Sequence, residues 1–175
     1  MPDRTGRRRL LRVLSVPMVL ALAGCSQAGE NTDDTAENGG RAGSDTEGLV
    51  TVAGDETVEA TVSRIESAIA DSPLTLITRI DHAENAASTG ERLPPTTLLL
   101  FGNPDIGTPL MRASRTIGLD LPQRMLVWEE NGHVHVTYND PSDVAERHGI
   151  EGQGERLETV SGVLQELATG EPSVE

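Results

Sequence analysis

The segment from Met125 to Tyr138 constrains the fold more than any other part of the chain. Met125 to Glu129 and His133 to Tyr138 are strand-like runs, and Asn131-Gly132 joins them. Asn-Gly is strongly favoured in the tight primed turn of a β-hairpin, because both positions require a positive φ. The sequence therefore predicts an antiparallel hairpin in the second half of the chain.

Two longer amphipathic helices are predicted, one early in the folded part and one at its end. The first has apolar residues at helical spacing: Val58, Val62, Ile65 and Ile69. Asp55 or Thr57 would cap its N-terminus, and Ser72-Pro73 would end it. The second helix closes the fold, and its apolar face consists of Leu157, Val160, Val163, Leu164 and Leu167. Both patterns have the period of a helix that buries one face.

Three further strands and three short helices complete the expected fold. The strands are Leu49 to Val52, Leu74 to Ile80 with Leu74, Leu76 and Ile80 turned inward, and Thr96 to Phe101, which is apolar on both faces. The short helices are residues 81–87, 109–115 and 142–148. We therefore expect a single small α+β domain over residues 49–170, with a mostly antiparallel sheet and helices packed on one face.

The loop Gly102-Asn103-Pro104 follows the central strand, where a phosphate-binding turn could lie. Neither G-x-G-x-x-G nor the P-loop pattern is present, and the chain has no lysine at all. We favour a structural interpretation, in which the loop ends the strand, Thr108 caps the next helix and Pro109 takes its first position.

The N-terminal region is expected to direct export and anchoring. Residues 1–24 combine five arginines with an apolar run and then Leu-Ala-Gly before Cys25, which indicates a lipoprotein signal peptide with Cys25 as the lipidated residue. A plain secretory signal, a short membrane anchor and a twin-arginine signal are alternatives. Residues 25–48 are polar and acidic and are expected to form a flexible linker that reaches about 25 to 30 Å. Residues 171–175 would be a short tail.

The charge is strongly negative. Residues 1–24 hold one acid and five arginines, so the rest of the chain carries 27 acids and 9 arginines, a net of 18 negative charges. This charge disfavours nucleic acid and anionic lipid surfaces as partners. An acidic chain without lysine is typical of salt-loving archaea, in which concentrated salt screens self-repulsion.

Several motifs together resemble one known family, called domain of unknown function 302. They are Ile80-Asp81-His82, Leu93-Pro94-Pro95, Leu99 to Pro104, Gly107-Thr108, Leu119 to Pro122 and Val127 to Glu129. The resemblance covers residues 49 to 150. It implies a small α+β domain with a sheet like that of the TATA-binding protein, often paired as a homodimer, and it supplies no reaction.

The candidate site residues fall into two groups. His82, Asn103, Asp120 and Tyr138 could bind a small polar ligand if their motifs converge, although the favoured interpretation is that His82 and Asp120 fix loops through hydrogen bonds to the backbone. His133 and His135 share one strand face and could hold a metal if His148 or Asp140 supplied a third ligand, although a polar hairpin face is the simpler interpretation.

The leading hypothesis is a membrane-tethered extracytoplasmic domain that binds a small ligand or a protein without catalysis, most plausibly as a homodimer and without nucleic acid. The rival is a metal-binding or redox- or sulfur-related accessory enzyme that uses His82 with Asp120, or His133 with His135. The sequence predicts no particular cofactor, and no catalytic residue is assigned.

Overall fold

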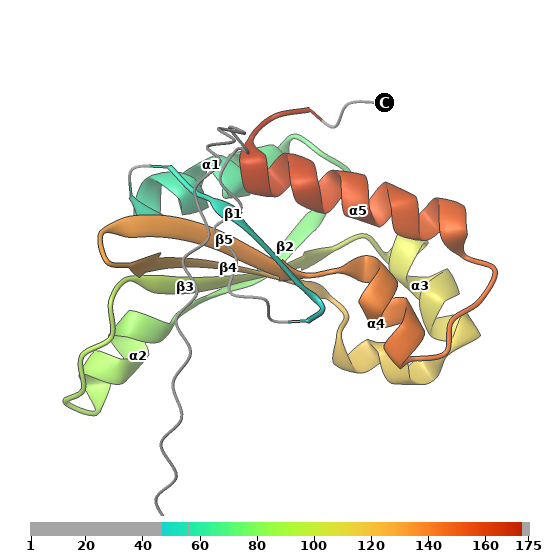
Figure 1. Ribbon diagram of the computed structural model, residues 1–175, viewed down its shortest axis with the longest axis horizontal. Helices are drawn as coiled ribbons and strands as arrows, with labels where there is room; N and C mark the ends of the chain where they lie inside the picture. Colours follow the sequence, from blue (N-terminus) through green and yellow to red (C-terminus); the bar gives the residue numbers. More distant parts are fainter. Residues whose placement is uncertain (1–46, 56, 173–175) are drawn as a thin grey trace, which may run out of the picture. The chain divides into compact units, whose positions relative to one another are not determined.

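Five strands form one antiparallel sheet in the computed structural model, which describes residues 47–55 and 57–172 (Figure 1). Their order across the sheet is β1-β5-β4-β3-β2. The strands are β1 (Leu49–Ala53), β2 (Thr75–Asp81), β3 (Thr96–Gly102), β4 (Gln123–Glu130) and β5 (His133–Asn139). The expected α+β fold with an antiparallel sheet is confirmed. The signal peptide, Cys25 and nearly all of the linker lie outside the described residues.

The predicted hairpin is confirmed. Strands β4 and β5 pair from Met125 opposite Tyr138 to Glu130 opposite His133. Asn131 and Gly132 both have positive φ, at 54° and 79°. These angles match the primed turn, which suits the right-handed twist of the two strands.

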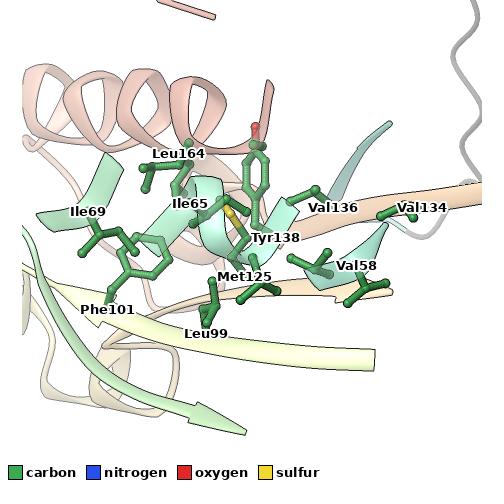
Figure 2. Close-up of a cluster of buried hydrophobic side chains, with 14 of the residues drawn as sticks. Val58, Ile65, Ile69, Leu99, Phe101, Met125, Val134, Val136, Tyr138 and Leu164 are labelled. Atoms are coloured by element: carbon green, nitrogen blue, oxygen red, sulfur yellow. The ribbon is translucent and has the colours of Figure 1, made fainter. Parts of the chain in front are cut away.

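Two helices cover one face of the sheet and create the main core. They are α1 (Val58–Ala70) and α5 (Gly154–Thr169), which lie side by side above the strands in Figure 1. All four predicted apolar residues of α1 are buried, and the Thr57 side chain accepts a hydrogen bond from the Ala60 backbone N–H at 3.0 Å. Figure 2 shows Ile65, Ile69 and Leu164 from the helices packed against Leu99, Phe101 and Met125 from the strands. The core is therefore built from the predicted faces.

Strand β2 departs from its predicted alternation. Its pairing with β3 shifts between Leu76 and Thr78, so Ile77 is an extra residue in the ladder. A bulge of this kind reverses the faces of the residues that follow it. Ile80 consequently pairs with Leu98 on the sheet face away from the main core, and the prediction that Ile80 points inward is wrong.

Helix α3 (Pro104–Ala113) begins five residues earlier than predicted. Asn103 is its N-cap, with the side-chain oxygen accepting a hydrogen bond from the Asp105 backbone N–H at 2.8 Å. Pro104 takes the first position and Pro109 lies inside the helix. Asn followed by Pro is itself a helix-start signal, and it prevailed over the later Thr108-Pro109 signal.

The remaining elements are α2 (His82–Ser88), the 3₁₀ helix η1 (Arg115–Leu119) and α4 (Pro141–Arg147). A second apolar cluster joins α3, η1 and α4 through Leu110, Ile117, Val144, Ala145 and Ile150. In the described part of the chain, no helix is both long and apolar enough to cross a membrane.

Candidate functional site

An apolar cavity of about 410 Å³ lies beside the main core. Strands β2 and β3, helices α3 and α5, and the segment from Gly118 to Gln123 form its walls. Its apolar lining includes Phe101, Ile106, Leu110, Leu121, Val160 and Leu164. None of its 19 lining residues is charged, and the polar ones are Thr75, Asn103, Thr108 and Gln123. The cavity falls within the size range of small-molecule sites.

Two glycines, Gly102 and Gly107, help to keep the cavity open because they have no side chain. A Cβ on Gly102 would lie 3.7 Å from the Pro122 Cβ, and one on Gly107 would lie 3.7 Å from the Leu121 Cδ1. Both distances are ordinary van der Waals contacts, and neither residue has a positive φ. Larger side chains at Gly107 would therefore extend into the cavity without straining the backbone.

The cavity mouth has an apolar rim. Ile77 is 58% exposed and Met111 is 40% exposed, and both line the cavity. Leu119 is 72% exposed and follows Gly118, another lining residue. These three are among five large apolar side chains that are exposed in the described residues. The bulge in β2 explains why the Ile77 side chain is exposed, because it leaves this residue out of the strand pairing.

A part-buried hydrogen-bond network holds the wall segment η1 to helix α4. The His148 Nε2 lies 2.7 Å from the Asp120 Oδ2, and its Nδ1 lies 2.9 Å from the Thr116 Oγ1. The side chains of Asp120 and His148 are only 12% and 7% exposed. Both ring nitrogens are therefore engaged, and the network fixes the imidazole between two points of the η1 segment.

Two arginines add positive charge around Asp120. The Arg147 guanidinium lies 3.3 Å from the Asp120 Oδ2, and that of Arg124 lies 3.8 Å from its Oδ1. Arg124 also donates a hydrogen bond to the Leu119 carbonyl. Burial raises the pKa of Asp120, but the hydrogen bond with His148 and the charge of Arg147 together lower it more, so the net pKa is below its ordinary value. The ionised form of Asp120 is thus favoured, and its role is to bind His148 and Arg147 within the structure.

The predicted convergence of His82 with Asn103 and Asp120 is wrong. His82 follows the end of β2 that pairs with Thr97, whereas Asn103 follows the end of β3 that pairs with Thr75. The six residues of strand between these ends correspond to about 20 Å. Antiparallel pairing therefore places His82 and Asn103 at opposite ends of the sheet. Asp120 lies near the Asn103 end, since Gln123 pairs with Phe101.

The other members of that group have different surroundings. Asn103 lines the cavity and caps α3. Tyr138 is 6% exposed and belongs to the main core, where Figure 2 shows its ring between Met125 and the helix layer. Burial and, to a smaller extent, Asp140 raise the pKa of Tyr138. The four residues do not form one site, so the enzyme hypothesis that joins His82 to Asp120 loses its geometry.

The histidine pair of β5 also lacks a complete site. His133 and His135 do lie on one strand face, opposite the buried Val134 and Val136. The expected third ligand is not supplied, because His148 is bound to Asp120. His135 instead stacks on Trp128, with ring centroids 4.7 Å apart. Within the described ranges, no three His, Cys, Asp or Glu side chains are placed to hold a metal ion.

A second cavity of about 550 Å³ adjoins the first. Both cavities are lined by Leu74, Asn103, Ile106 and Val163. The second also includes the charged Arg64, whose guanidinium donates to the Leu167 and Ala168 carbonyls at 2.8 and 3.1 Å. Arg64 therefore closes the C-terminal end of α5, which leaves the first cavity as the uncharged binding space.

Sequence reasoning did not find the cavity or the Asp120 network. The cavity walls come from five separate segments, and His148 lies 28 residues from Asp120. One feature of the sequence could have indicated the cavity mouth. Leu119 is a large apolar residue in a segment rich in Gly, Pro and polar residues, where an apolar side chain is expected to be exposed.

Known proteins resemble this chain in sequence and in fold. Two curated relatives, both called "Fluoride-specific ion channel FluC 1", come from Brucella suis biovar 1 (strain 1330) and Brucella abortus biovar 1 (strain 9-941). Each is 46% identical over 104 residues, which is 59% of this chain. The aligned part covers 41% and 38% of these relatives, so the chain matches well under half of their length.

The fold has a counterpart among solved structures. The crystal structure of an uncharacterized conserved protein DUF302 from Bacillus stearothermophilus aligns with a TM-score of 0.63 and 17% identity. The alignment covers 69% of this chain and 95% of the other. A family model described as "domain of unknown function DUF302" matches residues 50–167. The chain therefore belongs to the DUF302 family.

Proposed function

We propose that this chain is a non-catalytic binding module whose cavity takes a small, uncharged and largely apolar ligand. The observation that carries the proposal is the 410 Å³ cavity with no charged lining residue. Polar groups are few and lie apart, which suits orientation of a ligand more than chemistry on it. The site also offers no nucleophile paired with a base inside the cavity.

The charge of the chain narrows the ligand class. A chain with 27 acids after residue 24 repels anions from most of its surface. A cavity without a cation cannot compensate the charge of a buried carboxylate or phosphate, and burial of an unpaired charge is costly. An uncharged ligand avoids both penalties.

Binding of a neutral fluorescent probe, N-phenyl-1-naphthylamine, tests the proposal. The wild-type chain should bind it with saturation near one per chain. Gly107→Phe should weaken binding at least tenfold, because its ring would occupy the cavity. The matched control is Gly154→Phe. Gly154 also lies in a helix without a positive φ, a Cβ there would meet no atom within 4 Å, and the residue does not line the cavity. Absent binding, or equal binding by both variants, would refute the proposal.

We further propose that the module works at the extracytoplasmic face of a membrane, held by a lipid on Cys25. Leu-Ala-Gly-Cys and the polar linker of residues 25–48 support this placement. The curated relatives support work near a membrane as well, because a segment like this one forms part of chains named as ion channels. Mass spectrometry of the membrane fraction tests it: an acylated Cys25 as the N-terminal residue is expected, and an unmodified soluble chain would contradict it.

The proposal includes a homodimer built on the sheet face away from the main core. Leu98, Leu100, Leu126 and Trp128 are partly buried residues on this face. An apolar sheet face of this kind suits pairing with an identical copy. Light scattering after gel filtration should give twice the mass of one chain for the wild type. The Leu126→Glu variant should give the mass of a single chain. A wild-type monomer would contradict the pairing.

A further inference from the structure

The segment of residues 106–127 has a charge opposite to that of the rest of the chain. It contains three arginines and one acid, whereas the remainder after residue 24 contains six arginines and 26 acids. Arg112 and Arg115 are exposed, and the Arg124 side chain is 40% exposed. The single acid is Asp120, whose charge is already paired with Arg124, Arg147 and His148. A local positive surface therefore lies on α3 and η1.

Arg112 and Arg115 of this segment are close in the chain to the exposed apolar residues at the cavity mouth. Met111 precedes Arg112 in the last turn of α3, and Leu119 ends η1. Asp105 lies in the first turn of α3, at the other end of that helix from Arg112. Exposed apolar side chains flanked by arginines are the arrangement with which proteins attach to an anionic membrane surface.

We infer that the cavity mouth docks on an anionic lipid surface through Ile77, Met111 and Leu119, with Arg112 and Arg115 facing the headgroups. The inference deepens the proposed function, because it gives the uncharged ligand a route between the apolar cavity and the apolar layer of the membrane. It runs against the expectation from the net charge that anionic lipid is disfavoured, because the segment of residues 106–127 has a local charge of the opposite sign.

The orientation follows from two features that point the same way. The cavity lining is largely apolar and uncharged, and three of the five exposed large apolar side chains of the described residues lie at or next to its mouth. Leu93, an exposed apolar residue next to Arg92 in the loop before β3, lines neither of the two cavities described above. That pair therefore provides a matched comparison for Arg115 and Leu119.

A polarity-sensitive probe locates the docking surface directly. The chain from residue 26 onward contains the whole described fold and no cysteine, so Leu119→Cys or Leu93→Cys can be labelled with a nitrobenzoxadiazole group. Vesicles of equal parts phosphatidylglycerol and phosphatidylcholine should shift the emission at position 119 to the blue and leave position 93 unchanged. Vesicles of phosphatidylcholine alone should give a weaker response, and concentrated salt should reduce the response to anionic vesicles.

Substitution tests the same surface by vesicle sedimentation. Arg115→Gln/Leu119→Glu should weaken binding to the anionic vesicles at least tenfold, since one arginine near such a surface accounts for about fivefold. Arg92→Gln/Leu93→Glu should bind as the unmodified chain does. Circular dichroism of both variants checks that they are folded. Both pairs of residues are exposed, so neither change should disturb the core.

Three results would overturn the inference. They are the absence of binding by the unmodified chain to anionic vesicles, an equal loss in both double variants, and a blue shift at position 119 that appears without vesicles and disappears on dilution. The last result would assign the surface to a second copy of the chain. Failure of the proposed function looks different: vesicle binding would persist while the neutral naphthylamine probe failed to bind.

Discussion

Replacement of Asp120 by Asn tests whether its part-buried network holds the cavity wall in place. The substitution keeps the shape of the side chain and removes its charge. It weakens the charge-assisted contact with His148, which is 2.7 Å in length and lies between side chains that are 12% and 7% exposed. A hydrogen bond to a charged group contributes about 1.5 to 3 kcal/mol. The half-exposed Arg147 adds about 0 to 1 kcal/mol.

We therefore expect Asp120→Asn to lower the free energy of unfolding by about 2 kcal/mol. Urea unfolding at fixed salt, followed through the fluorescence of Trp128, measures this value. A double-mutant cycle with His148→Gln should give a coupling of about 1 to 2 kcal/mol, because the two residues share one contact. A loss under about 0.5 kcal/mol with no coupling would refute the reasoning, since that is the size of an ordinary surface change.

The pH dependence has a defined sign. The folded pKa of Asp120 is lowered, so its stabilising contribution is fully present above the unfolded pKa of about 4. The contribution is lost as the pH falls through the lower folded pKa. The difference in stability between the wild type and Asp120→Asn should therefore shrink as the pH falls below about 4. A difference that stayed constant through this range would contradict the assigned role.

Further predictions concern the core, a cap, the hairpin and salt, and urea unfolding measures each of them. Ile65→Ala should cost about 2 to 5 kcal/mol because Ile65 is 0% exposed in the main core. Thr57→Ala should cost about 1 kcal/mol because the Ala60 N–H loses its acceptor. Gly132→Val should cost at least about 1 kcal/mol because φ is 79° there. Added sodium chloride should raise the free energy of unfolding, since it screens a net charge that is strongly negative. For each of the three substitutions and for added salt, an unchanged free energy of unfolding would contradict the expectation.

Local patterns predicted most of the elements correctly. The Asn131-Gly132 turn and the helical spacing from Val58 to Ile69 each depend on neighbours within the same segment. Backbone preference and the period of a buried face act over such short distances, so the sequence states them directly. One error arose where two local signals competed: at the start of α3, Asn103-Pro104 prevailed over Thr108-Pro109.

The candidate site was beyond that reasoning. A bulge of one residue at Ile77 reversed the face of Ile80 and placed an apolar side chain at the cavity mouth. Whether a strand bulges is decided by its fit to neighbouring strands, and the alternation of side chains along β2 does not record it. The separation of His82 from Asn103 likewise depends on the antiparallel direction of β2 relative to β3 and on the length of these two strands.

The sequence by itself determined the class of fold, the faces of α1 and α5, the hairpin and the family. It also determined the net charge and the absence of any lysine. Tertiary structure decided which residues meet: it separated His82 from Asn103, joined Asp120 to His148 and enclosed an uncharged cavity between five segments. The physical reason is that helices and strands follow local periodicity, whereas a site depends on packing and register between residues far apart in the chain.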